Sequence, residues 1–192
     1  MGYNARKAAQ TIAYLAIRND REPMHVVQVA KLVYLADRES IRRYGFPVLD
    51  EVRVSMKHGP VNLQTYEHIN GEEDPTKNGW GDFLSDRASH TVGLAKADLN
   101  DDDLDELSDA EIEVLDAVWD QFGHMPVWGP KGIRDWTHDP ENIPEWEDPG
   151  SSLSRIPLER IMRNVGVANA AEQATLVQQL EHIDDVFRSL AN

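Results

Sequence analysis

The sequence contains no cysteine, so the chain can form no disulfide and offers neither a thiolate nucleophile nor a thiolate zinc ligand. The absence of disulfides fits a reducing compartment. The chain also lacks any run approaching the ~18 consecutive apolar residues of a membrane helix. Residues 1–7 lead into an amphipathic segment rather than an apolar signal core. We therefore expect a cytoplasmic protein that makes no use of a membrane.

Basic residues are few: the chain has 19 Lys and Arg and 34 Asp and Glu, which gives a net charge of −15. The imbalance belongs to the later part of the chain: residues 1–60 carry a net +4 and residues 61–192 a net −19. Such a chain repels phosphate backbones as a whole, so we do not expect nucleic-acid binding except through a locally basic face. A basic protein surface is a more natural partner, although the charge is also consistent with a role in solubility alone.

The length of 192 residues, with 41% hydrophobic and 28% charged side chains, is typical of an ordinary globular protein with one sizeable core. We expect a single domain over residues 1–192. Apolar residues recur every three or four positions in several segments, which is the periodicity of a helix with one buried face. The predicted helices cover residues 5–19, 25–44, 61–69, 108–123, 126–136 (which Pro130 could split), 157–165 and 170–190. Gly45 supplies a stop for the second helix, and Ser108 with Glu111 forms a capping box for the fourth.

Strand character is limited to two short segments. Residues 52–57 alternate apolar with charged or polar side chains, as a half-buried strand does, and residues 58–60 then predict a turn. Residues 91–95 either pair with 52–57 as a hairpin-like ribbon or remain an irregular connector. The expected fold is mainly α (α+β), a compact helical domain with a small β-ribbon at one edge.

Three stretches differ from generic helix-forming sequence: KLVYLADR at 31–38, MKHGPV at 56–61, and DWTH at 135–138 followed by PEW at 144–146. Their order and spacing resemble those of the Panacea domain family, which includes SocA-like antitoxins and phage-associated proteins, and the resemblance covers about residues 8–147. The matched signature residues, which we take as candidates for partner binding, are Tyr34, Asp37, Arg38, His58, Gly59, Pro60, Trp136 and His138.

The resemblance implies an antitoxin of a toxin–antitoxin pair. Such a protein neutralises a cognate toxin, encoded next to it, by direct binding, and in the SocA case it delivers the toxin to a cellular AAA+ protease. The family's toxins differ widely, so the resemblance does not identify the toxin, and the oligomeric state also stays open.

On the second predicted helix, Tyr34, Asp37, Arg38 and Ile41 share one face. Asp37 can accept hydrogen bonds, and Arg38 offers a planar fork to a carboxylate. Two interpretations remain open: these polar groups tie the helix to the ribbon or to the His58 turn, or they face a partner.

Two rival functions follow from other residues. In the first, a hydrolase would use His58 as a general base oriented by Asp37 or Asp135, which requires a concave pocket that holds them together. In the second, a DNA-binding regulator would present a basic face made of Arg38, Arg42, Arg43, Arg53 and Lys57.

Three further patterns are weaker. No pair among His58, His138, Asp37 and Asp139 has the spacing of two strong ligands on one helix, so we expect no metal and no cofactor. Trp136 and Trp146 are expected to anchor their loop in the core, whereas an exposed tryptophan would indicate a binding hot spot. The nine acids of residues 98–113 indicate either a solvated segment or a surface for a basic toxin.

Overall fold

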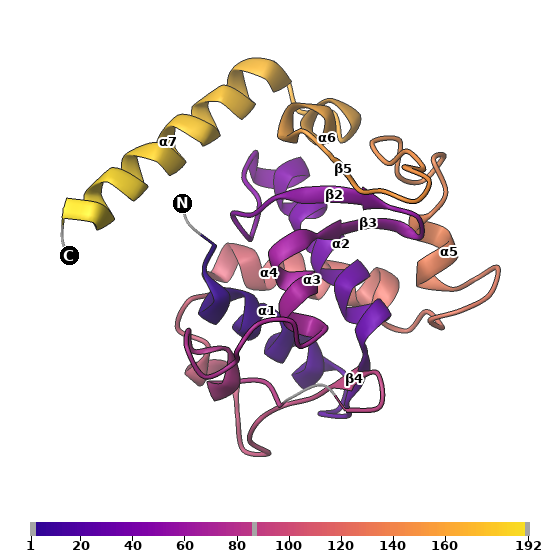
Figure 1. Cartoon of the computed structure of the whole chain (residues 1–192), viewed down its shortest axis with the longest axis vertical. Coiled ribbons are helices and arrows are strands. Elements are labelled where there is room, and N and C mark those ends of the chain that lie inside the picture. The colour runs from indigo at the N-terminus through magenta and orange to yellow at the C-terminus, as the bar shows by residue number, and fades with distance from the viewer. Residues whose placement is uncertain (1–2, 86–87, 191–192) are drawn as a thin grey trace.

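The computed structural model describes residues 3–85 and 88–190, and for residues 181–190 it describes the backbone alone (Figure 1). The described chain contains the α-helices α1 (Ala5–Arg18), α2 (Val26–Tyr44), α3 (Leu63–Ile69), α4 (Asp109–Val118), α5 (Ile133–Thr137), α6 (Leu158–Asn164) and α7 (Ala170–Leu190). Its strands are β1 (Met24–His25), β2 (Arg53–Met56), β3 (Gly59–Asn62), β4 (Thr91–Val92) and β5 (Ser154–Arg155). The predicted fold class, a mainly helical α+β protein, is confirmed. No helix among the described residues is long and apolar enough to cross a membrane.

The ends of the principal helices follow from side-chain and backbone caps. The Asn4 side chain accepts a hydrogen bond from the Lys7 N–H at the start of α1, and Ser108 and Glu111 form the predicted capping box of α4. Gly45 ends α2 in the left-handed conformation, with φ of 76°, and its N–H donates to the Ile41 carbonyl.

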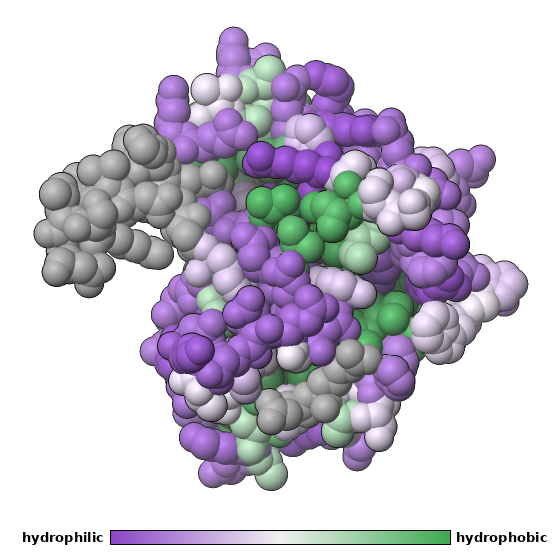
Figure 2. Space-filling view, in the orientation of Figure 1, coloured by the Kyte–Doolittle hydropathy of each residue, from purple (hydrophilic) through white to green (hydrophobic). Residues whose placement is uncertain are grey.

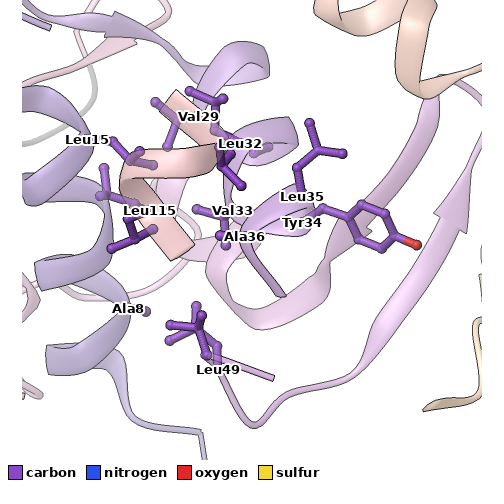
Figure 3. Close-up of a cluster of buried hydrophobic side chains, with 14 of the residues drawn as sticks. Ala8, Leu15, Val29, Leu32, Val33, Tyr34, Leu35, Ala36, Leu49 and Leu115 are labelled. Atoms are coloured by element: carbon purple, nitrogen blue, oxygen red, sulfur yellow. The ribbon is translucent and has the colours of Figure 1, made fainter. Parts of the chain in front are cut away.

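Helix α2 lies at the centre of the fold and contacts α1, α4, α5 and the β2–β3 hairpin. One side of α2 packs against apolar residues of α1 and α4, where Leu15, Leu32 and Leu115 point toward one another (Figure 3). The Tyr34 ring leaves α2 on the opposite side, toward the sheet (Figure 3). Because α2 is enclosed on both sides, its polar residues must find partners inside the protein.

The larger sheet is antiparallel with strand order β3-β2-β5, and β4 pairs with β1 in a separate two-stranded ribbon. The pairing of residues 91–95 with 52–57 is therefore wrong, because Met24 and His25 lie opposite Val92 and Thr91. Residues 59–62, predicted as a turn leading into a helix, form β3 instead, with Pro60 opposite Ser55. A proline without an N–H is tolerated there because β3 is an edge strand.

Two predicted helices are shorter than expected. Helix α4 ends at Val118 and continues as a π-helical turn, η3 (Trp119–Gly123). Of the predicted helix at 126–136, only α5 at its end is helical, because residues 126–132 form turns around Pro130. At the other end of the chain, α7 begins against α6 and then extends away from the body of the protein (Figure 1).

Candidate functional site

Asp37 lies at the centre of a buried polar network that joins α2 to the sheet. Its Oδ1 accepts from the Leu49 N–H at 2.9 Å, and its Oδ2 accepts from Arg53 Nε at 2.8 Å and from Asn62 Nδ2 at 2.9 Å. Arg53 also donates to the Leu49 carbonyl. The Asp37 side chain therefore fixes the position of β2 and β3 on α2 and is closed to solvent.

Tyr34 and Arg38 meet on a single carboxylate. The Tyr34 hydroxyl and Arg38 Nε donate to Oε1 of Glu145, at 2.9 and 2.7 Å. Glu145 is fully buried, and its second oxygen, Oε2, is buried and accepts no hydrogen bond from the residues that the structure describes. Burial and the nearby Glu145 carboxylate raise the pKa of Tyr34 well above its usual value, so the hydroxyl stays a donor. These bonds hold the PEW loop against α2.

A second buried carboxyl lies close to this network. Glu51 accepts from the Thr65 hydroxyl at 2.6 Å and the Thr65 N–H at 2.8 Å, and from Asn62 Nδ2 at 3.2 Å. Burial raises the pKa of Glu51 to about 7, although the bonds from Thr65 act in the opposite direction. Near neutral pH this group is therefore partly protonated.

The end of the β2–β3 hairpin lies over the first turns of α2. Gly59 has φ of 98°, and a Cβ there would lie 2.9 Å from Lys31 Nζ and 3.1 Å from the Thr137 carbonyl oxygen. Lys31 Nζ donates to the Pro60 carbonyl at 2.9 Å, and its residue is only 4% exposed. Gly59 therefore leaves room for the buried amine of Lys31 under the hairpin, and the Pro60 carbonyl binds that amine.

His58 is exposed at the hairpin turn and has a cation as its nearest partner. Arg134 Nη2 donates to His58 Nδ1 at 2.8 Å, and Asp135 Oδ1 lies 3.4 Å from Arg134 Nη1. Desolvation, followed by the charge of Arg134, lowers the pKa of His58. Because Asp37 is enclosed with Arg53 and Asn62, the His58–Asp37 pair that a hydrolase would need is not formed.

A groove of about 400 Å³ lies beside the hairpin, between β3 and the N-terminal half of α2. Figure 2 shows hydrophobic residues gathered at the surface next to the hairpin, with hydrophilic residues around them. Trp128 stands at the groove with 53% of its surface exposed, and the Arg134 guanidinium lies 5.4 Å from its ring centroid. The lining consists of Val27, Ala30, Lys31, Met56, Lys57, His58, Gly59, Val61, Tyr66, Trp128 and Arg134.

The two signature residues from the late motif contact different parts of the protein. Trp136 is partly buried and packs on Phe122, with 4.7 Å between ring centroids. Exposed His138 lies 4.5 Å from the Trp146 ring and 6.3 Å from the His58 ring. Trp146 is buried, as expected of a core anchor, and donates from Nε1 to the Met56 carbonyl at 2.9 Å. Trp136 instead borders a second cavity, of about 570 Å³, together with Arg38.

The basic face proposed for DNA binding does not exist as one surface. Arg53 is buried in its ion pair with Asp37, and Arg38 is paired with Glu145. Arg42 and Arg43 both bind Glu39. Lys57, at the groove, has no ion pair among the residues that the structure describes. The expectation for Arg53 is wrong because strand β2 is covered on both faces, so its charged side chain points into the protein.

Four residues that matter at these sites are absent from the predicted set. Lys31 and Glu145 lie inside the quoted motifs. Their charge among neighbouring apolar or aromatic residues was the feature of the sequence that could have indicated a role for them. Trp128 and Arg134 lie between motifs and gave no comparable signal. Among the described residues, no three His, Asp or Glu side chains gather as a set of metal ligands.

Comparison with known proteins agrees with the motifs. The family model described as antitoxin SocA-like, Panacea domain, matches residues 29–147, which is more than half of the chain. The match begins in α2, so α1 lies outside it, although the sequence resemblance was placed from about residue 8. No curated protein and no solved structure matches the chain significantly. The resemblance is thus confirmed: the chain belongs to the SocA-like antitoxin family with a Panacea domain.

Proposed function

We propose that this protein is an antitoxin that neutralises a cognate toxin protein by binding it directly. Family membership supports an antitoxin-type role in general. The observation that carries the specific proposal is the open, largely apolar groove beside the signature residues His58, Gly59 and Pro60, with Trp128 exposed at its edge. An exposed tryptophan in an apolar depression is typical of a protein–protein hot spot.

Binding fits the composition of this groove better than hydrolysis does. Among the described residues that line it there is no Asp or Glu, and the Nδ1 atom of His58 accepts from Arg134 rather than facing a carboxylate. A general base needs a partner that stabilises its protonated form, whereas Arg134 opposes protonation. The groove therefore supplies apolar contact and positive charge but no oriented acid–base pair.

The toxin is expected to be the product of the adjacent reading frame. Co-expression of that gene with this protein tests the proposal, with growth and co-purification by size exclusion as readouts. Growth rescue together with a stable complex is the expected result. A neighbour that is toxic alone, is not rescued, and forms no complex would contradict the proposal.

Delivery of the toxin to a AAA+ protease is a separate step that the same assay distinguishes. Toxin levels are followed by immunoblot in wild-type and protease-deficient hosts. If delivery contributes, the toxin disappears only when the protease and this protein are both present. Rescue with an unchanged toxin level in both hosts would indicate neutralisation by binding alone.

A further inference from the structure

The groove beside the hairpin is positively charged, although the chain as a whole carries a net charge of −15. Lys57 and Arg134 line it together with the buried amine of Lys31, and none of the described lining residues is acidic. His58 also lines it, with its pKa lowered by desolvation and by the charge of Arg134. Asp135 is the acid bound to Arg134, at 3.4 Å, and it lies outside the lining. A cluster of basic side chains on an otherwise acidic protein favours the binding of an anionic group at that place.

Lys31 is the most deeply buried of these basic residues. When protonated, its Nζ has three donors, and one of them is used by the Pro60 carbonyl. Among the described residues Lys31 has no ion pair, and burial together with the charge of Arg134 lowers its pKa to about 7. An anion that reached this amine would supply the missing counter-charge in a site sheltered from water.

The rest of the groove is apolar. Val27, Ala30, Met56 and Val61 form its walls, and exposed Trp128 adds a large aromatic face. A phosphate backbone is strongly hydrated and would gain little from such walls, and the acidic remainder of the chain would repel it. The lining fits a ligand that combines one carboxylate with a large apolar group.

We infer that this groove binds a segment of the toxin that presents an acidic side chain beside a large apolar residue. The carboxylate pairs with Lys31 and Arg134, and the apolar side chain lies between Val61 and Trp128. This inference rests on the proposed antitoxin function, since it names the surface and the partner chemistry through which that function operates.

Affinity for the purified toxin is measured by titration calorimetry with two groove variants and two matched controls. Trp128→Ala removes the exposed ring and is expected to weaken binding by about 30-fold or more, the effect of a hot-spot residue. Lys57→Glu reverses a charge at the groove and should weaken binding most at low salt. The controls Leu153→Ala and Lys77→Glu change exposed residues elsewhere, of which Leu153 matches Trp128 in exposed fraction, and both should stay within about twofold of wild type.

A second measurement needs no toxin. 4-Phenylbutyrate and its uncharged amide are titrated into the free protein, and NMR follows the Trp128 indole N–H. The carboxylate should bind at least about tenfold more tightly than the amide. Lys31→Met, and independently Arg134→Gln, should remove this preference, with near-UV circular dichroism as the check on folding.

The two measurements separate the two proposals. A carboxylate preference at the groove without any toxin complex would overturn the antitoxin proposal and support the chemistry assigned to the groove. A toxin complex that tolerates Trp128→Ala and Lys57→Glu would overturn the groove assignment and leave the antitoxin proposal intact. Equal binding of the carboxylate and the amide would also overturn the groove assignment.

Discussion

Asp37 on α2 and Arg53 on β2 form an ion pair inside the protein, with 2.7 Å between Oδ2 and Nη2. Both side chains are almost completely closed to solvent. Asp37 also accepts hydrogen bonds from Asn62 and from the Leu49 N–H, and Arg53 donates to the Leu49 carbonyl. Removing water from two charges is costly, and the remaining bonds offset this cost only while both partners are present. The pair therefore specifies how the sheet is placed on α2.

Asp37→Ala is expected to lower the free energy of unfolding by about 3–5 kcal/mol, because it leaves the Arg53 guanidinium buried without its counter-charge. Urea denaturation followed by circular dichroism measures the change. Asp74→Ala is the control, since that carboxylate is exposed, where it pairs with Lys77 and accepts from Thr76, and its loss should destabilise the protein much less. Equal effects of the two substitutions would refute the structural role of Asp37.

Tyr34→Phe is expected to destabilise the protein by about 1–3 kcal/mol. The substitution removes one of the two donors to Glu145 Oε1 and leaves that buried carboxylate with Arg38 alone. Thermal unfolding by calorimetry gives the change. Tyr44→Phe removes a hydroxyl from an exposed tyrosine and should have little effect. A Tyr34 variant as stable as the Tyr44 variant would show that the buried bond contributes nothing.

Glu51 predicts a specific dependence of stability on pH. Its pKa in the folded protein, about 7, lies above the ordinary 4.5, so the folded state holds this proton more tightly than the unfolded state. The stability that the protonated group contributes is present below about pH 4.5 and is lost as pH rises to about 7.

The Glu51→Gln variant has an amide in place of the carboxyl group, so this position no longer ionises. Relative to the wild type, the variant should therefore gain roughly 2–3 kcal/mol between pH 5 and pH 8. Urea midpoints across that range measure the gain. Asp37 and Arg53, whose charges also act on Glu51, are present in both proteins, and the exposed Glu72→Gln controls for loss of a carboxyl at the surface. A constant difference across the pH range would refute the raised pKa.

Gly59→Ala is expected to destabilise the protein more than Gly71→Ala. Both glycines have positive φ, 98° and 75°, so both substitutions carry the cost of a left-handed backbone, about 1–2 kcal/mol. Only at Gly59 would the new Cβ meet neighbours, Lys31 Nζ and the Thr137 carbonyl, which should add about 1–3 kcal/mol. Chemical denaturation of both variants isolates this packing contribution, and equal losses would contradict the close approach.

The helices were predictable because buried apolar residues recur in them every three or four positions along the chain. Residues 5–19 and 25–44 were found to within a residue or so, since each has an apolar stripe and a clear end such as Gly45. Strand β3 was not predicted, because Gly59 and Pro60 are normally turn residues and only an edge position accommodates them. The pairing of β1 with β4 was not predicted, because it joins segments more than sixty residues apart. In addition, a strand of two residues is too short to show the alternation of apolar and polar side chains.

The signature motifs were recognised as significant, but their roles could not be read from the sequence. Arg53 looked like the exposed side of an alternating strand, whereas α2 and its network enclose it. Glu145 lay between Pro144 and Trp146, and nothing local indicated that Tyr34 and Arg38 would both reach it. The groove depends on Trp128 and Arg134, which come to His58 only through the tertiary fold.

Strand β5 lies beyond the end of the family match at residue 147, yet it completes the sheet by pairing with β2. The Ile156 N–H that follows it donates to the Arg53 carbonyl at 2.7 Å, beside the buried ion pair. A protein truncated at the family boundary would therefore expose one edge of β2, with backbone groups free to recruit strands from other molecules. The segment that matches the family and the smallest soluble folding unit are thus expected to differ. The folding unit should extend at least through α6, whose Ile161 and Met162 are buried in the core.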